Sequence, residues 1–453
     1  MNAAPGFRMH LEPSEGSPRN VAAPVIDMLY PRGSRSRIPI LAVTGTNGKS
    51  TTGRMLSQIL RQTGATVGLT STSGIYIGDE QIAAADASGP KSARMVLRDP
   101  TVDVAVLETA RGGILREGLG FDRCDVGAVL NIQADHLGTK GVETLKDLAA
   151  VKSVVVEAVK RQGCSVLNGD DPLTLAMRRH AGGRIGLFSL RGGEATPEFL
   201  REHIAQGQLA VVREPAEGGG EIVIFDRGER LPLMRASDIP ATMGGLAEFN
   251  TQNALAAVAM TFAHGVAPDV IRAALAGFTS SFEQNAGRLN VHDANGFRVI
   301  VDYAHNPAGL AALCDLVTKL RPAYSRVISM ISIPGDRRDE DIRQMGEIAA
   351  RASDEIVFRE APDGRGRPSG EVNSLMSEGA IAVGFGYEHM RRIIRERDAV
   401  QACLQMARPG DLVVLTPTSV EQVWKQVLNF QTTPESQGQA QSEPQRAQES
   451  IHA

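Results

Sequence analysis

Short runs of Val, Ile and Leu alternate along the first half of the chain with longer amphipathic segments. The apolar runs are each followed by glycine or polar turn residues and read IPILAVTG, TVDVAVLET, CDVGAVLNI and CSVLNGDD. Between them lie segments with the pattern of helices, such as STTGRMLSQILRQTG and VETLKDLAAVKSVVVEAVKRQG. Buried strands that alternate with helices predict an α/β fold with a mostly parallel sheet and helices on both faces.

The same organisation starts again near residue 280. FRVIVDYAHN predicts a strand that ends in a polar turn, AGLAALCDLVTKLRP predicts a helix, and RVISMISIPGDRRDEDI predicts a strand, a loop and a helix. Further strands are predicted in DEIVFRE, AIAVGFG and DLVVLTP. Together they indicate a second α/β unit of roughly 150 residues, an ordinary domain size.

The chain of 453 residues is too long for one core, so we expect more than one domain. The first segment is rich in Gly, Pro, Ser and Arg and holds one short helical candidate, VAAPVIDMLYP. The last is rich in Gln, Ser, Pro and Glu and is predicted to be disordered. The predicted parts are an extension (1–37), a central domain (38–280), a C-terminal domain (281–430) and a tail (431–453).

Composition narrows the class of protein. Hydrophobic residues make up 42% and charged residues 22%, and the net charge is −4, so we expect neither a nucleic-acid nor a membrane partner. No apolar run approaches the roughly 20 residues of a membrane span, and the N-terminus lacks the apolar core of a secretory signal. The four cysteines, at 124, 164, 314 and 403, have no metal-ligand spacing and fit reduced thiols. We therefore predict a cytoplasmic protein.

The stretch ILAVTGTNGKSTT (40–52) joins an apolar strand, a glycine turn and the start of a helix. This arrangement turns backbone N–H groups and a helix dipole toward an anion. Lys49 is predicted to contact the outer phosphates of a nucleotide, and Ser50 or Thr51 a magnesium ion. The common phosphate-loop spacing requires glycine where this chain has Val43. The alternative is a tight turn with no ligand. The predicted phosphate loop comprises Gly45, Thr46, Asn47, Gly48, Lys49, Ser50 and Thr51.

The spelling Gly-Thr-Asn-Gly-Lys-Ser-Thr-Thr resembles that of the Mur ligase family, the ATP-dependent amino-acid ligases of cell-wall precursor, folate and cyanophycin synthesis. Further segments resemble the same family in the same order: VLETARGG, NIQADHLG, LNGDDP, NTQNALAA, GRLN and VDYAHNP. The resemblance covers about residues 38–430. It implies a central phosphate-loop domain, a C-terminal Rossmann-like α/β domain, and an acid–amino-acid ligase that uses ATP and magnesium.

The resemblance implies three metal-site residues besides Ser50. Glu108 ends a predicted strand, where ligands bind in parallel sheets, and carboxylate oxygens suit magnesium. His136 is implied as a ligand of a second magnesium ion; the alternative is a buried core histidine. Lys152 matches a lysine that is carbamylated in the family and helps to hold that ion; the alternative is a surface lysine with a buried stem. Together with Lys49 these three are the predicted catalytic residues. Further ATP contacts are implied for Asn253, Arg288 and Asp302.

Within the family, the chain resembles the Mur-ligase half of cyanophycin synthetases in ETARGGILREGLGFDRCDVGAVLNIQADHLG, KSVVVEAV, DYAHNPAG, PGDRRDEDI and RPGDLVVL. That half is thought to add arginine to the aspartate side chains of polyaspartate. The chain carries no match to the ATP-grasp module of those enzymes, so a separate ATP-grasp protein is a predicted partner. Homo-oligomers are common in the resembling enzymes. The alternatives are another incoming amino acid, a β-Asp-Arg dipeptide substrate, or a non-catalytic partner of a full synthetase.

The C-terminal domain is predicted to bind the incoming amino acid. Carboxylates in GDRRDEDI suit a cationic side chain, and an arginine there suits an α-carboxylate. A second loop, FREAPDGRGRPSGE, offers Glu360, Arg365, Arg367 and Glu371. For both loops the alternative is solvated charge. The predicted substrate-binding residues are Thr72, Arg111, His305, Asn306, Asp336, Arg337, Arg338 and Asp339.

Three segments depart from the resembling enzymes. Ser73 stands where the synthetases tend to have Asp, and Pro417, Thr418 and Ser419 stand where they tend to be acidic. Phe249 replaces a histidine usual in the cell-wall members. The first two changes remove negative charge, so we expect them to bear on arginine specificity more than on ligase chemistry.

Overall fold

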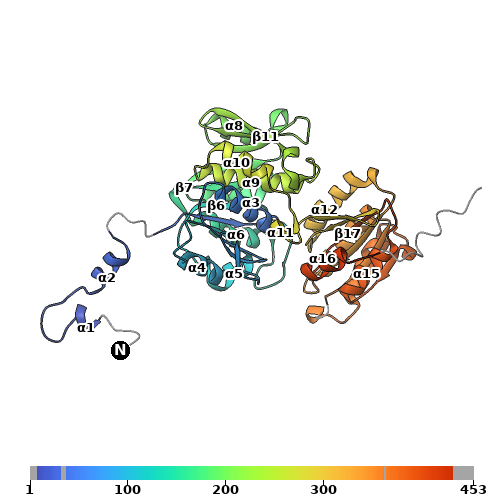
Figure 1. The fold of residues 1–453 in the computed structure, drawn as a ribbon, viewed down its shortest axis with the longest axis horizontal. Coiled ribbons are helices and arrows are strands. Elements are labelled where there is room, and N and C mark those ends of the chain that lie inside the picture. The colour runs from blue at the N-terminus through green and yellow to red at the C-terminus, as the bar shows by residue number, and fades with distance from the viewer. Residues whose placement is uncertain (1–7, 32–36, 362–363, 432–453) are drawn as a thin grey trace, which may run out of the picture.

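The computed structural model describes residues 8–31, 37–361 and 364–431. Most of these residues form two α/β bodies, one built on an eleven-stranded sheet and the other on a six-stranded sheet (Figure 1). The predicted disordered tail lies almost wholly outside the described residues.

The first sheet has the strand order β11-β10-β9-β8-β7-β6-β1-β5-β2-β3-β4. Its seven middle strands, from β9 to β2, run parallel, and antiparallel hairpins complete both ends. The strands are β1 (Ile40–Thr44), β2 (Val67–Ser71), β3 (Gly74–Ile77), β4 (Glu80–Ala83), β5 (Val104–Glu108), β6 (Cys124–Val129), β7 (Val159–Asn168), β8 (Arg184–Ser189), β9 (Leu209–Glu214), β10 (Glu221–Asp226) and β11 (Glu229–Arg235).

Helices cover both faces of this sheet, as its apolar strands require. They are α3 (Lys49–Arg61), α4 (Pro90–Arg98), α5 (Arg111–Glu117), α6 (Leu145–Glu157), α7 (Pro172–Ala176), α8 (Glu198–Ala205), α9 (Glu248–Ala263) and α10 (Pro268–Ala276). Because successive side chains of a strand point to opposite faces, the residues of β1 pack into two different hydrophobic cores. Leu41 and Val43 pack in the core that holds α3 and α9, while Ile40 and Ala42 pack in the core beside α4. The predicted mostly parallel α/β sheet is confirmed.

The second sheet has the order β12-β13-β17-β14-β15-β16, with β12 antiparallel and the others parallel. Its strands are β12 (Asn290–Ala294), β13 (Phe297–Val301), β14 (Val327–Ser332), β15 (Glu355–Arg359), β16 (Met390–Arg392) and β17 (Leu412–Leu415). Helices α12 (Pro307–Leu320), α13 (Asp339–Ala352) and α14 (Glu371–Ala382) cover one face, and α15 (Glu396–Met406) and α16 (Val420–Leu428) cover the other. The short helix α11 (Phe282–Asn285) joins the two bodies (Figure 1).

Two local predictions were wrong. AIAVGFG is not a strand, because its first three residues form the last turn of α14, where the buried Ala380 packs in the core, and Gly384 then ends the segment with a left-handed φ. The helix predicted through VEAVKRQG ends at Glu157, and β7 begins two residues later at Val159. Short apolar runs have no period that separates a buried helix from a buried strand.

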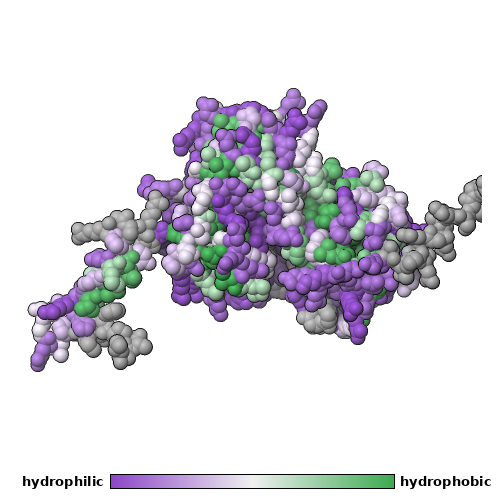
Figure 2. All heavy atoms as spheres, viewed as in Figure 1, coloured by the Kyte–Doolittle hydropathy of each residue, from purple (hydrophilic) through white to green (hydrophobic). Residues whose placement is uncertain are grey.

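The N-terminal segment carries α1 (Arg8–Leu11) and α2 (Ala22–Leu29) and extends away from both bodies (Figure 1). The predicted short helix is α2. It buries none of its residues, and Val25, Ile26, Met28 and Leu29 form an exposed apolar group that is visible in Figure 2. Across the described ranges, no helix has the length and apolarity to cross a bilayer.

Candidate functional site

A cavity of about 950 Å³ opens at the carboxyl edge of the first sheet, and the second body supplies part of its wall. Strands β6, β1, β5 and β2 are neighbours and run parallel, so their following loops meet at this edge. Sixteen predicted site residues line the cavity: Gly45, Thr46, Asn47, Gly48, Lys49, Ser50, Thr51, Thr72, Glu108, Arg111, His136, Lys152, Arg288, His305, Asp336 and Arg337.

The glycine loop is held by Asn131, which follows the neighbouring strand β6. The Asn131 side-chain oxygen accepts hydrogen bonds from the N–H groups of Thr46 (3.0 Å) and Asn47 (2.9 Å). Gly48 begins α3 with φ +87°, and a Cβ at this position would collide with the side chain of Asn253. Glycine is therefore required both by backbone conformation and by space. The loop places the first turn of α3 against the cavity, which is the arrangement of an anion site.

Glu108 has one oxygen satisfied and one without a partner. Its Oε2 accepts hydrogen bonds from the Ser50 hydroxyl (2.9 Å) and the Thr72 N–H (3.2 Å). Its Oε1 is buried and has no hydrogen-bond partner in the part of the chain that the structure describes. A buried, unpaired carboxylate oxygen is costly in a folded protein and is suited to a cation. Glu108 and Ser50 therefore fit a magnesium ion.

Two lysines lie near this carboxylate. Lys49 donates to the Thr46 carbonyl (2.9 Å), and Lys152 donates to the Gly45 carbonyl (2.7 Å). Lys152 is buried, so the alternative of a surface lysine is wrong. Burial lowers the pKa of Lys49, and burial together with the nearby Lys49 charge lowers the pKa of Lys152 well below its usual value. A lysine amine with a lowered pKa is suited to chemistry that needs the uncharged form.

Asp135 and His136 follow β6 and form the third part of the site. His136 has a left-handed φ of +57°, a conformation that concentrates at functional sites. Burial lowers its pKa to about 4, against the opposing charge of Asp135. Burial alone would raise the pKa of Asp135, but His305, His136 and Arg337 together hold it well below its usual range. The pair is therefore a neutral imidazole beside an ionised carboxylate.

The second body contacts the glycine loop directly. The amide groups of Asn47 and Asn306 pair reciprocally, at 3.2 Å and 3.0 Å. Asn306 also caps α12, accepting from the Gly309 N–H (2.8 Å). Arg288 lies 5.0 Å from the centre of the Tyr303 ring and lines the cavity. These contacts fix where the second body stands relative to the phosphate loop.

Five predicted residues do not line the cavity: Asn253, Asp302, Asn306, Arg338 and Asp339. Arg338 pairs instead with Asp341 (2.8 Å), and Asp339 accepts from Arg367 (2.6 Å). The cavity also has walls that the site prediction did not include. These are chiefly Asp86 and Ser88 just before α4, Lys91 in its first turn and Arg116 in the last turn of α5, together with Asp135. The segment Asp-Ala-Ser-Gly (86–89), just before α4, is the signal from which this wall could have been predicted.

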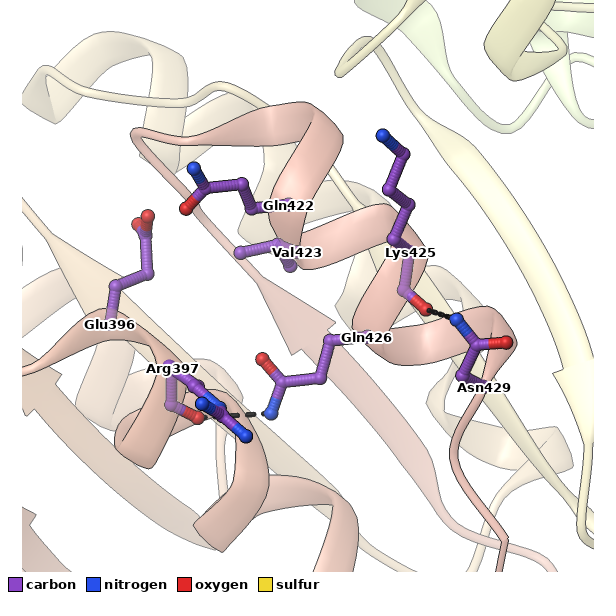
Figure 3. A pocket seen from close by; sticks show the side chains of 7 residues that line it. All are labelled: Glu396, Arg397, Gln422, Val423, Lys425, Gln426 and Asn429. Carbon is purple, nitrogen blue, oxygen red and sulfur yellow. Dashed lines mark hydrogen bonds between the residues drawn. The ribbon is translucent and has the colours of Figure 1, made fainter.

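A smaller pocket of about 280 Å³ lies between α15 and α16, away from all predicted site residues. Figure 3 shows its polar side chains, among them Glu396, Gln422 and Gln426, spaced around an open surface depression. Gln426 donates to the Arg397 carbonyl (3.0 Å). The pocket holds none of the predicted site residues.

Comparison with known proteins identifies the two bodies. The family model of the Mur ligase middle domain matches residues 43–261, and the model of the Mur ligase glutamate ligase domain matches residues 287–419. The chain belongs to the Mur ligase family. The prediction of an ATP-dependent ligase of this type is confirmed at the level of the family.

Relatives within the family include long and short proteins. The chain is 47% identical over 422 residues to cyanophycin synthetase of Synechocystis sp., a match that covers 93% of this chain and 47% of the relative. It therefore spans about half the length of that relative. It is 29% identical to UDP-N-acetylmuramoylalanine–D-glutamate ligase of Pelotomaculum thermopropionicum, covering 94% of this chain and 80% of that protein.

Solved structures share the fold at low identity. FolC of E. coli, in complex with DHPP and ADP, superposes with a TM-score of 0.62 at 18% identity and covers 86% of this chain and 88% of its own. MurF of Acinetobacter baumannii superposes with a TM-score of 0.60 at 21% identity, covering 87% of this chain and 77% of its own. The Mur-ligase-like fold that was predicted is confirmed.

Proposed function

We propose that this Mur ligase homologue is an ATP-dependent amide ligase that joins the amine of arginine to an aspartate side-chain carboxylate of a polyaspartate or β-aspartyl substrate. The observation that carries the proposal is the unpaired Glu108 oxygen beside Lys49 and Ser50 at the glycine loop. An anion cradle next to a cation-seeking carboxylate suits a nucleotide polyphosphate with its magnesium ion. The similarity to cyanophycin synthetase supports the choice of substrates.

In the proposed reaction, the acceptor carboxylate attacks the γ-phosphorus of ATP and forms an acyl phosphate and ADP. The amine then attacks the acyl carbon, and the tetrahedral intermediate expels inorganic phosphate while the nitrogen loses a proton. Lys49 is placed to stabilise charge on the transferred phosphoryl group, and the loop N–H groups hold the other phosphates. Magnesium, when bound by Glu108 and Ser50, neutralises charge on the phosphate oxygens.

The two bodies have different proposed roles. The first binds ATP and the acceptor, and the second brings Arg288, His305, Asp336 and Arg337 to the opposite wall of the cavity. We propose that this second wall binds the incoming amino acid and excludes water, which otherwise hydrolyses an acyl phosphate. His136 and Lys152, the latter as its carbamate, are proposed to hold a second magnesium ion.

The experiment incubates the purified chain with ATP, magnesium, a synthetic oligo-aspartate and each amino acid in turn, and measures phosphate release and product mass. Release that requires arginine, with a product heavier by one arginine less water, supports the proposal. Release with a different amine keeps the ligase chemistry and corrects the substrate. Absence of release with every amino acid, and with a β-Asp-Arg dipeptide, contradicts a stand-alone ligase and leaves the alternative of a non-catalytic partner.

A further inference from the structure

Arg337 belongs to the second body but inserts its side chain into the site of the first. It follows β14, and its side chain is only 3% exposed. Its Nε donates to Asp135 Oδ1 at 3.0 Å, and its Nη2 lies 2.8 Å from His136 Nε2. Its Nη1 donates to Asp336 (2.7 Å), and Arg367 holds its backbone carbonyl (2.8 Å). A single guanidinium thus connects the two bodies at the wall of the cavity.

The contact defines the state of His136. A guanidinium has only donors, so the Nε2 atom facing it must be the unprotonated, accepting nitrogen. That lone pair is the one a metal ion would take, since a metal binds the neutral imidazole. Two cations cannot occupy the same lone pair. The guanidinium also balances the ionised Asp135, which a metal ion would otherwise do.

We propose that Arg337 is a removable plug of the metal position at His136. A divalent cation binds there only when the guanidinium withdraws, so metal loading at His136 is opposed by the contact that ties the second body to the first. This inference rests on the proposed role of His136 as a metal ligand. The released guanidinium can move into the cavity of about 950 Å³ that Arg337 itself lines.

Manganese titration tests the plug without using activity. Free Mn²⁺ is measured by electron paramagnetic resonance as it is added to the full chain with a non-hydrolysable ATP analogue. We expect two ions per chain, and Arg337→Gln should bind the second about tenfold or more tightly, since a charge-assisted hydrogen bond no longer competes. Arg337→Lys, whose ammonium cannot form the two-pronged contact, should give a smaller gain and keeps a cation beside Asp135 if the first variant folds poorly.

Arg338→Gln is the matched control. It removes the same charge from the next residue, but Arg338 pairs with Asp341 and its side chain is 43% exposed. We expect no change in the second Mn²⁺ affinity. Adding His136→Ala to Arg337→Gln should abolish the gain.

Several results overturn the proposal. Equal affinity in wild type and Arg337→Gln, an equal gain in Arg338→Gln, or a gain that persists without His136 each contradict the plug while leaving the proposed ligase intact. If no variant binds a second ion, the plug and the proposed metal role of His136 both fall, and the ligase proposal is then judged by phosphate release alone.

Discussion

The two sheets end differently at their carboxyl edges. In the first, Lys49 at the start of α3, Glu108 at the end of β5 and Lys152 in α6 surround a cavity. One oxygen of Glu108 has no partner among the described residues. In the second, the edge is closed by Arg359, the last residue of β15, whose side chain is 1% exposed. Its Nη2 contacts Ser332 (2.9 Å), Thr418 (2.6 Å) and Glu396 (3.0 Å).

This difference supports the proposal that the reacting groups lie in the first body. Both bodies are α/β sheets whose architecture favours binding at the carboxyl edge. In the first, Glu108 lines the cavity and its Oε1 has no hydrogen-bond partner among the described residues. In the second, the Nη2 of Arg359 makes its contacts within its own body, and its buried Nε has no partner among the described residues. The second body reaches the site through loops, above all the one that carries Arg337. Thr418, one of the residues that stand where the resembling synthetases tend to be acidic, contacts Arg359 and does not line the cavity.

Removing Lys49 from the carboxyl edge of the first sheet, called here the open edge, should have the largest effect on activity. Lys49→Ala is expected to lower ATP-dependent phosphate release by about 1,000-fold or more, because charge on the transferred group loses its stabilising partner. The fold should persist, as judged by an unchanged thermal transition. Lys91→Ala is the control, because Lys91 lines the same cavity with an 81% exposed side chain and should keep near-normal release. Near wild-type turnover in Lys49→Ala would refute the role.

Removing Arg359 from the carboxyl edge of the second sheet, called here the closed edge, should lower the stability of the fold and not the rate of phosphate release. Arg359→Met leaves Glu396 without its buried cation, and we expect the free energy of unfolding to fall by about 3 kcal/mol. Urea unfolding measures it. Arg343→Met, which removes a 41% exposed arginine paired with Glu378, should cost less than about 1 kcal/mol. If the two variants lose equal stability, the second edge is not closed in the way described.

Asp302, in the second body, should make the free energy of unfolding depend on pH. Burial raises the pKa of Asp302 in the native state to about 6, above its value of 3.8 in the unfolded chain. Between these two pH values the native carboxyl group is protonated, whereas the unfolded one has lost its proton. Stability therefore falls as pH rises from about 4 to 6, and the loss is complete above the folded pKa. Relative to Asp302→Asn, the wild type should lose about 2 kcal/mol of unfolding free energy between pH 4 and 7. Parallel stability curves for the two proteins would contradict a raised pKa.

The smallest expected effect concerns the contact between the bodies. Asn306→Asp keeps a side-chain oxygen that can accept at the cap of α12, but the carboxylate cannot donate to Asn47. We expect unfolding free energy to change by less than about 1 kcal/mol and ATP affinity to weaken several-fold, measured by calorimetry. Asn306→Ala removes the cap as well, at an added cost of about 1 kcal/mol. Unchanged ATP affinity in both variants would show that the asparagine pair does not shape the nucleotide site.

Much of the open edge was predictable from sequence, because its residues follow apolar strands. Lys49, Glu108 and His136 each stand just after such a run, and parallel strands bring their ends together. The fold class followed for the same reason, since the alternation of apolar runs and amphipathic segments persists over both bodies.

The parts that were not predicted depend on contacts between distant segments. Asn131 secures the glycine loop from 84 residues away, and nothing local marks it as doing so. Arg338 and Asp339 share a loop with Arg337, yet only Arg337 faces the cavity, because the start of α13 turns the other two toward Asp341 and Arg367. A charged loop sequence shows that the loop could bind a ligand, but the tertiary structure decides which of its side chains face the cavity.

The central claim is that the open edge makes an acyl phosphate. It is tested most directly with oligo-aspartate labelled with ¹⁸O in its side-chain carboxylates, incubated with the chain, ATP, magnesium and arginine. Because the attacking carboxylate oxygen stays with phosphorus when the amine displaces phosphate, the account predicts one ¹⁸O in each inorganic phosphate released, seen by mass spectrometry. Phosphate released without ¹⁸O while the amide product forms would contradict it.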